Sequence, residues 1–245
     1  MRPLTGLLTD RSALFLDFDG TLAELAPRPD AVVVPHDLPA LLMRLHDRLG
    51  GALAIVTGRA QADLKCLLGP LSLPAAFEHG AVRQTAAGES ALPTPVSLHA
   101  ALAAAEGLAA QHSGLLVERK RTSLALHYRL APELEALCLS TLADAVRGDP
   151  ALQLLRGKAV VEVKSARVSK GEAIRAFLQE APFAGRSPLF AGDDVTDEAG
   201  FEVVQQFGGA GIKVGAGDSL ALHRLPDPPA LRTWLQSAPF LLHTP

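Results

Sequence analysis

Short apolar runs alternate along the chain with longer segments in which apolar residues recur at helical spacing. The run 13–18 (ALFLDF) is typical of a buried strand, and the segment 36–49 that follows is typical of an amphipathic helix ended by Gly50-Gly51. The same patterns predict further strands at 52–57, 77–84, 188–191 and 211–214, and further helices at 60–68, 169–179 and 197–206. This alternation predicts an α/β fold with a doubly wound parallel sheet.

The middle of the chain has a different order of elements. Two expected helices are each followed by a pair of strands, and this order predicts a small antiparallel α+β module inserted into the α/β domain. The helices are expected at about 95–112 and 132–147, and the strands at 115–118, 122–128, 151–155 and 159–163. Pro93 and Pro95 mark the entrance of the insert. We therefore expect a core domain of residues 1–92 and 166–245 and an inserted domain of residues 93–165.

The composition excludes several classes of protein. Of the 245 residues, 48% are hydrophobic and 20% are charged, which is the balance of a globular chain and not of a disordered one. The net charge of −3 shows no basic excess, so neither nucleic acid nor an anionic membrane is an expected partner. No apolar run approaches the ~20 residues that cross a bilayer. Two cysteines, Cys66 and Cys138, fit a reducing compartment, and we expect a cytoplasmic protein.

Two carboxylates lie at the end of the first predicted strand, in the string Asp17-Phe18-Asp19-Gly20-Thr21. Residues at i and i+2 of a strand point to the same side, and ligands of parallel sheets bind at the carboxyl ends of the strands. Carboxylates this close resist joint ionisation unless a cation or a proton compensates, and a hard cation such as Mg²⁺ is the natural partner of such oxygens. A strand followed by a simple Asp-Gly turn is the alternative.

Two further strings combine a helix start with a group that can meet an anion. Thr57-Gly58-Arg59 follows the second strand and offers a hydroxyl and backbone N–H groups, although Thr57 alone could simply cap a helix. Ser169 and Glu172 have the spacing of a helix cap, which places Lys170 in the first helical turn. A cation there opposes the helix dipole and therefore indicates a phosphate or an aspartate pair nearby, unless it is a solvated surface lysine.

A third acidic string, Gly192-Asp193-Asp194-Val195-Thr196-Asp197, follows another predicted strand. Asp193 and Asp194 can complete a cation site, and Asp197 can cap a helix or support the ligands from behind. Each string by itself could be an ordinary turn or helix cap. Together, at one edge of one sheet, they provide an aspartate nucleophile, metal carboxylates, an anion site and a lysine, which is a set suited to phosphoryl transfer.

In this order, the strings DFDGT, VTGR, SKGEA and GDDVTDE resemble the haloacid dehalogenase (HAD) superfamily of phosphohydrolases. Within it, LDFDGTLAEL, ALAIVTGR, ALHYR and VVEVK are most similar to the trehalose-6-phosphate phosphatase family. The likeness covers nearly the whole chain, including the insert. It implies a HAD-like doubly wound core with the insert as an α/β cap that closes over a sugar.

The resemblance also implies roles for the core residues. Asp17 corresponds to the aspartate that attacks phosphorus and forms an aspartyl-phosphate, and Asp19 to the general acid and base, whose backbone carbonyl also reaches the metal. Thr57 and Lys170 correspond to the residues that hold the phosphoryl oxygens. The metal ligands would be Asp17, Asp19 and Asp193, with Asp194 and Asp197 in support.

Further residues are expected at the substrate. Around the phosphoryl group these are Gly58, Arg59, His79 and Gly80, although His79 could equally be a buried, hydrogen-bonded core histidine. In the cap, Glu118, Lys120 and Glu162 would read the distal glucose. An exposed face of Glu and Lys in surface ion pairs, each contributing under ~1 kcal/mol, is the alternative for these cap residues.

The resemblance thus predicts a phosphoric monoester hydrolase: a Mg²⁺-dependent enzyme that converts trehalose 6-phosphate to trehalose and phosphate in trehalose biosynthesis. It also implies a functional link to the synthase that makes trehalose 6-phosphate. Two other hypotheses stay open. One is another sugar phosphatase of the same fold, such as one for sucrose phosphate, and the other is a non-catalytic domain that binds a sugar phosphate and regulates a partner.

Overall fold

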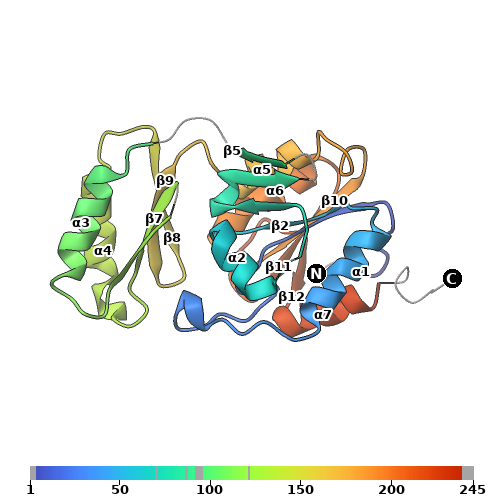
Figure 1. Ribbon diagram of the computed structural model, residues 1–245, viewed down its shortest axis with the longest axis horizontal. Coiled ribbons are helices and arrows are strands. Elements are labelled where there is room, and N and C mark those ends of the chain that lie inside the picture. Colours follow the sequence, from blue (N-terminus) through green and yellow to red (C-terminus); the bar gives the residue numbers. More distant parts are fainter. Residues whose placement is uncertain (1–3, 70, 86–87, 92–95, 121, 239–245) are drawn as a thin grey trace. The chain divides into compact units, whose positions relative to one another are not determined.

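The computed structural model describes residues 4–69, 71–85, 88–91, 96–120 and 122–238 (Figure 1). The chain divides into two compact units. The larger consists of Met1–Ala26, Val32–Ala91 and Ser169–Pro245, and the smaller of Pro27–Ala31 and Leu92–Val168. Pro93 and Pro95, predicted to mark the entrance of the insert, lie outside the described residues.

The larger unit is built on one eight-stranded sheet with the order β12-β11-β10-β1-β2-β3-β4-β5. Its parallel strands are β1 (Ser12–Leu16), β2 (Leu53–Val56), β3 (Ala75–Phe77), β10 (Ser187–Gly192), β11 (Ala210–Val214) and β12 (His223–Leu225). The chain runs outward from β1 in one direction through β2 and β3, and in the other through β10 to β12. This confirms the doubly wound parallel sheet, whose direction of winding reverses between β1 and β10.

Both faces of the central strands are covered. Every residue of β1, β2 and β11 is buried, as expected for parallel strands packed between two layers of helices. The larger unit contributes α1 (Leu38–Arg48), α2 (Gln61–Leu68), α5 (Lys170–Phe177), α6 (Glu198–Gln206) and α7 (Pro228–Gln236). The apolar stripe of α1, formed by Leu38, Leu41, Leu42 and Leu45, shows the helical spacing that predicted this element, and all four residues are buried.

The strand predicted over 77–84 is wrong as one element. β3 ends at Phe77, a single 3-10 turn covers Glu78–Gly80, and β4 (Val82–Thr85) returns antiparallel to β3 and pairs with β5 (Gly88–Ala91). The reversal is made by three consecutive residues with positive φ, at 48° for Glu78, 59° for His79 and 105° for Gly80. Only glycine adopts such φ values without steric cost, so hydrophobic pattern alone could not reveal the turn.

The smaller unit has the predicted order of helix, two strands, helix, two strands. These elements are α3 (His99–Ala109), β6 (Leu116–Arg119), β7 (Ser123–His127), α4 (Glu135–Ala145), β8 (Leu152–Gly157) and β9 (Val160–Ser165), with a 3-10 turn before α4 (Pro132–Leu134). The strands form an antiparallel sheet in the order β6-β7-β9-β8. Leu124, Leu126, Val161 and Val163 belong to one buried cluster with residues of α3 and α4. Because side chains alternate along a strand, their neighbours Ser123, Ala125 and Glu162 lie on the opposite face.

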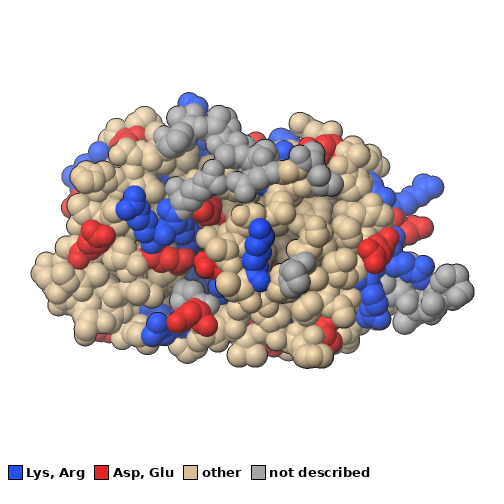
Figure 2. Space-filling model, in the orientation of Figure 1, with Lys and Arg blue, Asp and Glu red and all other residues tan. Residues whose placement is uncertain are grey.

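The surface charges fit the small net charge. On the face shown in Figure 2, Lys and Arg side chains are interspersed with Asp and Glu, and the described residues form no large patch of one sign there. Within the described part of the chain, none of the helices is both long enough and apolar enough to cross a membrane.

Candidate active site

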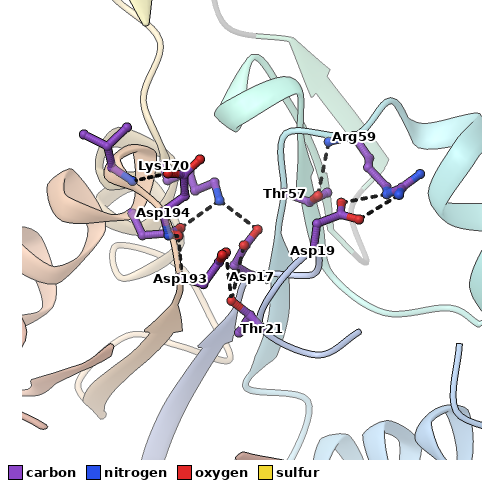
Figure 3. A network of polar contacts seen from close by, with 10 residues as sticks. Asp17, Asp19, Thr21, Thr57, Arg59, Lys170, Asp193 and Asp194 are labelled. Carbon is purple, nitrogen blue, oxygen red and sulfur yellow. Dashed lines mark hydrogen bonds and ion pairs between the residues drawn. The ribbon is translucent and has the colours of Figure 1, made fainter. Parts of the chain in front are cut away.

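Three strands of the large sheet end at polar residues that lie at the same edge (Figure 3). Asp17 directly follows β1, Thr57 follows β2, and Asp193 follows β10. β1 lies between the other two strands, and the backbone N–H of Asp17 bonds to the carbonyl of Ala191 in β10. The point between β1 and β10 is where the winding of the sheet reverses, and this is where open α/β sheets bind their ligands.

Asp17, Asp193 and Asp197 form a buried acidic group whose ligand atoms all lie within 4.8 Å of one another. Lys170 lies in the middle of this group, with its Nζ 2.7 Å from Asp17 Oδ1 and 2.7 Å from Asp197 Oδ1. The side chain of Lys170 is only 3% exposed, which excludes the alternative of a solvated surface lysine. Its helix begins as predicted, because Ser169 Oγ accepts the N–H of Glu172 at 3.1 Å.

Burial and charge act together on these groups. Burial raises the pKa of Asp17 well above its usual value, and the nearby Asp197 and Asp193 add to this effect, against the opposing influence of Lys170. Burial alone would lower the pKa of Lys170, but Asp17 and Asp197 outweigh it and raise that pKa, so the ammonium is retained. The buried ammonium groups nearby are those of Lys170 and of Lys213, whose Nζ donates to the backbone carbonyl of Asp193, and two positive charges do not balance three carboxylates. The site therefore favours a further cation.

Two glycines allow the carboxylates to approach the backbone this closely. Gly20 has φ of 74°, and a Cβ built on it would lie 2.2 Å from Asp193 Oδ2. A Cβ on Gly192 would lie 2.3 Å from Cγ of Asp197. Neither position has room for a side chain, so both glycines are needed for the packing of the acidic group and not merely for chain reversal.

Asp194 and Asp197 organise the loop after β10. Both oxygens of Asp197 are engaged: Oδ1 accepts from Lys170, and Oδ2 accepts the backbone N–H groups of Asp193 and Asp194 at 2.9 Å each. Asp194 accepts the N–H of Val195 at the start of the 3-10 turn Val195–Asp197. Asp197 thus fixes the loop that carries Asp193.

Asp19 lies apart from the acidic group and faces Arg59 (Figure 3). Arg59 Nε and Nη2 donate to Asp19 Oδ2 and Oδ1, both at 2.7 Å, in a two-bonded ion pair. The backbone N–H of Arg59 donates to Thr57 Oγ1 at 3.1 Å. α2 begins at Gln61, one residue after the predicted start, and its N-cap position is Ala60. The alternative that Thr57 caps this helix is therefore wrong.

The strained turn at His79 is joined to the loop of Thr57. The backbone N–H of His79 donates to the carbonyl of Thr57 at 2.9 Å, and that of Glu78 donates to the carbonyl of Arg59 at 3.0 Å. Gly58 lies so close to the His79 ring that a Cβ on it would be 2.6 Å from Cε1. The predicted residues Gly58, Arg59, His79 and Gly80 thus belong to two loops that support each other. Positive φ at non-glycine residues is a form of strain that clusters at functional sites.

The predicted cap residues also form polar contacts with one another. Lys120 Nζ lies 3.5 Å from Glu162 Oε1, and both side chains are only 9% exposed, which excludes a simple solvated ion pair. Ser123 Oγ donates to the same oxygen of Glu162 at 2.6 Å. His127 Nε2 donates to Glu118 Oε2 at 2.7 Å, and although burial opposes ionisation, this bond and Lys120 lower the pKa of Glu118.

Sequence reasoning missed several of these partners. Ser123 and His127 lie at alternate positions of a predicted strand, on the face of Glu162, and that period could have identified them. Lys213 of β11 is buried and its Nζ donates to the backbone carbonyl of Asp193. A lysine inside the apolar string AGIKV was the available signal for it. Thr21 Oγ1, 3.4 Å from Asp17 Oδ2 and 3.5 Å from Asp193 Oδ1, was inside the quoted string but was given no role.

Comparisons with known proteins show which sequences and folds this chain resembles. The sequence model of the Trehalose-phosphatase family matches residues 15–225. The chain is 43% identical over 239 residues to the trehalose-6-phosphate phosphatase of Escherichia coli K12, covering 94% of this chain and 87% of that protein. It is 45% identical over 238 residues to a probable trehalose-phosphate phosphatase of Sinorhizobium fredii, covering 94% and 89%. The C-terminal domain of Candida albicans trehalose-6-phosphate phosphatase has the same fold, with a TM-score of 0.83, 22% identity, and coverage of 93% and 91%.

Proposed function

The chain belongs to the trehalose-phosphatase family, and from this premise we propose that it hydrolyses trehalose 6-phosphate to trehalose and inorganic phosphate. One observation carries the chemical part of the proposal: a buried carboxylate, Asp17, held by a buried lysine at the edge of the sheet where ligands bind. A binding module has no need of such a nucleophile, so this arrangement favours an enzyme over a regulatory domain.

Asp17 is the proposed nucleophile. Its carboxylate oxygen attacks phosphorus, the bond from phosphorus to the sugar oxygen breaks, and an aspartyl-phosphate forms on Asp17. Lys170 holds the attacking carboxylate through its 2.7 Å bond, and its charge can stabilise the phosphoryl oxygens. The hydroxyl of Thr57, at the end of β2, is the proposed donor to one of these oxygens.

Asp19 is the proposed general acid and base. In the first half-reaction it gives a proton to the departing sugar oxygen. In the second it takes a proton from water, which attacks phosphorus and releases phosphate and the free Asp17 carboxylate. Its side chain is 30% exposed, so water has access to the carboxylate.

The donor set of the acidic group fits Mg²⁺. All three groups are carboxylates and all are buried, and oxygen ligands with excess negative charge suit a hard cation better than zinc. Asp17 and Asp193 would hold the ion, with the predicted backbone carbonyl of Asp19 as a further ligand, while Asp197 and Asp194 hold the loop that carries Asp193. When bound, the ion supplies charge that neutralises the phosphoryl group.

Mg²⁺ is expected to raise the thermal stability of the protein as well as to support turnover. At 100 times its Kd, a ligand of the folded state adds about 2.7 kcal/mol, or on the order of 5–10 °C in Tm for a chain of this size. Because the pKa of Asp17 is raised in the fold, the folded state loses stability as pH rises above the ordinary pKa of an aspartate. The gain from Mg²⁺ over EDTA should therefore be larger at pH 7.5 than at pH 5.

Melting curves of two single variants provide the controls. Asp193→Asn should remove most of the gain, whereas Asp63→Asn, at an exposed position of α2, should keep it. A wild-type protein whose Tm is the same in Mg²⁺ and in EDTA, and which is active in EDTA after dialysis, would exclude the metal site.

The sugar is the proposed ligand of the polar face of the smaller unit. Glu118, Lys120 and Glu162 offer charged groups in a hydrogen-bonded network, which is suited to sugar hydroxyls. Binding energy from the distal sugar can be used to assemble a closed site, as in other enzymes with a lid. The proposed reaction also requires a synthase that supplies trehalose 6-phosphate, which is the expected functional link.

Phosphate release from three substrates tests this function and separates it from its alternatives. Trehalose 6-phosphate should exceed sucrose 6-phosphate and p-nitrophenyl phosphate in kcat/KM. Lys120→Ala should lower kcat/KM for trehalose 6-phosphate by about 10- to 150-fold, the effect of losing a charged hydrogen bond, and for the aryl phosphate by less than about 3-fold. Arg119→Ala, an exposed neighbour on β6, should change neither value.

Each alternative has its own outcome in this experiment. Preference for sucrose 6-phosphate would change the substrate and keep the reaction. No phosphate from any substrate would indicate the regulatory domain. An equal fall for both substrates in Lys120→Ala would remove the sugar-reading role of the smaller unit.

A further inference from the structure

The ion pair of Arg59 and Asp19 differs from a surface ion pair in its two hydrogen bonds and in the burial of the arginine. The guanidinium uses two nitrogens on two carboxylate oxygens, at 2.7 Å each, and its carbon lies 5.7 Å from the ring centroid of Phe18. The Arg59 side chain is 10% exposed and that of Asp19 is 30% exposed. The arginine is therefore largely buried, while the carboxylate keeps an accessible side.

The backbone of Arg59 is held independently of this ion pair. Its N–H donates to Thr57 Oγ1 and its carbonyl accepts the N–H of Glu78, so the turn is fixed on both sides. Gly58 packs against the His79 ring with no space for a side chain. The guanidinium is thus presented from a rigid turn, which is how groups that orient a reactive residue are usually supported.

We propose that Arg59 is a positioning residue for Asp19: its two-bonded pair fixes the plane and direction of the carboxylate that exchanges protons with the sugar oxygen and with water. This inference rests on the proposed function, because it concerns the acid and base of that reaction. It differs from the direct substrate contact that resemblance predicts for Arg59. Both short bonds of the guanidinium described above are directed to Asp19, and its central carbon lies 5.7 Å from the ring centroid of Phe18.

Lysine cannot replace arginine in this role. An ammonium is a single point charge without a planar pair of donors, so the Arg59→Lys variant would keep the charge but not the orientation of the carboxylate. The orientation matters most when the leaving group needs a proton. It matters little for p-nitrophenolate, which leaves without one.

A double-mutant cycle of Arg59→Lys and Asp19→Asn tests the proposal, with kcat and KM measured for trehalose 6-phosphate and p-nitrophenyl phosphate. Arg59→Lys should lower kcat for the sugar phosphate by roughly 10- to 100-fold, a part of the 10²–10⁴ that general acid catalysis supplies, with little change in KM. For p-nitrophenyl phosphate, kcat should fall by less than about 5-fold. In the Asp19→Asn background, Arg59→Lys should lower kcat for the sugar phosphate by less than about 3-fold, because the carboxylate that Arg59 orients is already absent.

Arg83→Lys is the matched control. Arg83 is also a mostly buried arginine in an ion pair, with Glu180 at 2.8 Å, and lies 4.9 Å over the ring of Phe177. Arg83→Lys should leave kcat and KM unchanged for both substrates. Melting curves of all variants should show a folded protein. Arg59→Gln, which removes the charge, provides a second variant if the lysine variant does not fold.

The outcomes are distinct. If Arg59→Lys lowers kcat by the same factor in the wild-type and in the Asp19→Asn background, Arg59 acts on the substrate directly and the proposal is wrong. The proposal is also wrong if kcat is unchanged and only KM rises. A wild-type protein that releases no phosphate from either substrate would overturn the proposed function, and this inference with it. Results on the Arg59 variants alone would overturn only the inference.

Discussion

Asp17→Asn is expected to lower kcat by roughly 10⁴-fold or more, the scale seen when other covalent enzymes lose their nucleophile. The amide has nearly the same shape but is a poor nucleophile and a poor metal ligand. Phosphate release from trehalose 6-phosphate and from p-nitrophenyl phosphate should fall together, since both substrates need the same attack. No phosphate should remain covalently bound to the variant after an acid quench.

The same variant is expected to fold at least as well as the wild type in EDTA. Burial and two neighbouring carboxylates raise the pKa of Asp17, so its charge opposes folding, and removing it relieves that cost while Lys170 keeps its bond to Asp197. Asp10→Asn, at an exposed position, is the matched control and should retain full activity. A folded Asp17→Asn protein with more than a few per cent of wild-type turnover would falsify covalent catalysis by Asp17.

Most of the sheet could be predicted because its strands are continuous apolar runs that end at polar residues. Asp17, Thr57 and Asp193 each follow such a run, and the rule that parallel strands end at one edge places them together without any knowledge of distance. Lys170 could be placed by its helix cap. Its unfavourable place in the first turn indicated a phosphate or an aspartate pair nearby. That Lys170 is buried and that Asp17 and Asp197 are its partners could not be predicted, because capping fixes where a helix begins and not what faces its first turn.

The parts that sequence reasoning missed depend on backbone geometry or on tertiary approach. The turn at Glu78 and His79 requires positive φ in residues that rarely adopt it, so neither hydrophobic period nor composition indicates it. The pair of Arg59 with Asp19 joins residues 40 positions apart through two loops whose shapes are set by their neighbours. Such contacts follow from the folded arrangement and not from local pattern.

Lys170→Met is expected to remove activity and also much of the stability, which distinguishes it from Asp17→Asn. Methionine fills a similar volume but leaves Asp17 and Asp197 buried without their common cation. Breaking a buried ion pair by removing one partner typically costs about 3–5 kcal/mol, whereas an exposed substitution stays within about 0.5 kcal/mol. Activity should fall by at least about 10³-fold, because the phosphoryl oxygens lose their charge partner and Asp17 its orientation.

The loss of stability in Lys170→Met should grow as the pH rises. Without Lys170, the folded protein holds a proton on its acidic group more tightly than the unfolded chain does, so stability should fall further as pH rises from 5 to 8. Urea unfolding of Lys170→Met at both pH values, beside wild type and the exposed Lys65→Met, measures this directly. A loss of similar size at pH 5 and pH 8 would show that Lys170 stabilises the fold by packing alone. The double variant Asp17→Asn with Lys170→Met should be more stable than Lys170→Met, because one of the two carboxylates left without a cation is then neutral. It should remain equally inactive.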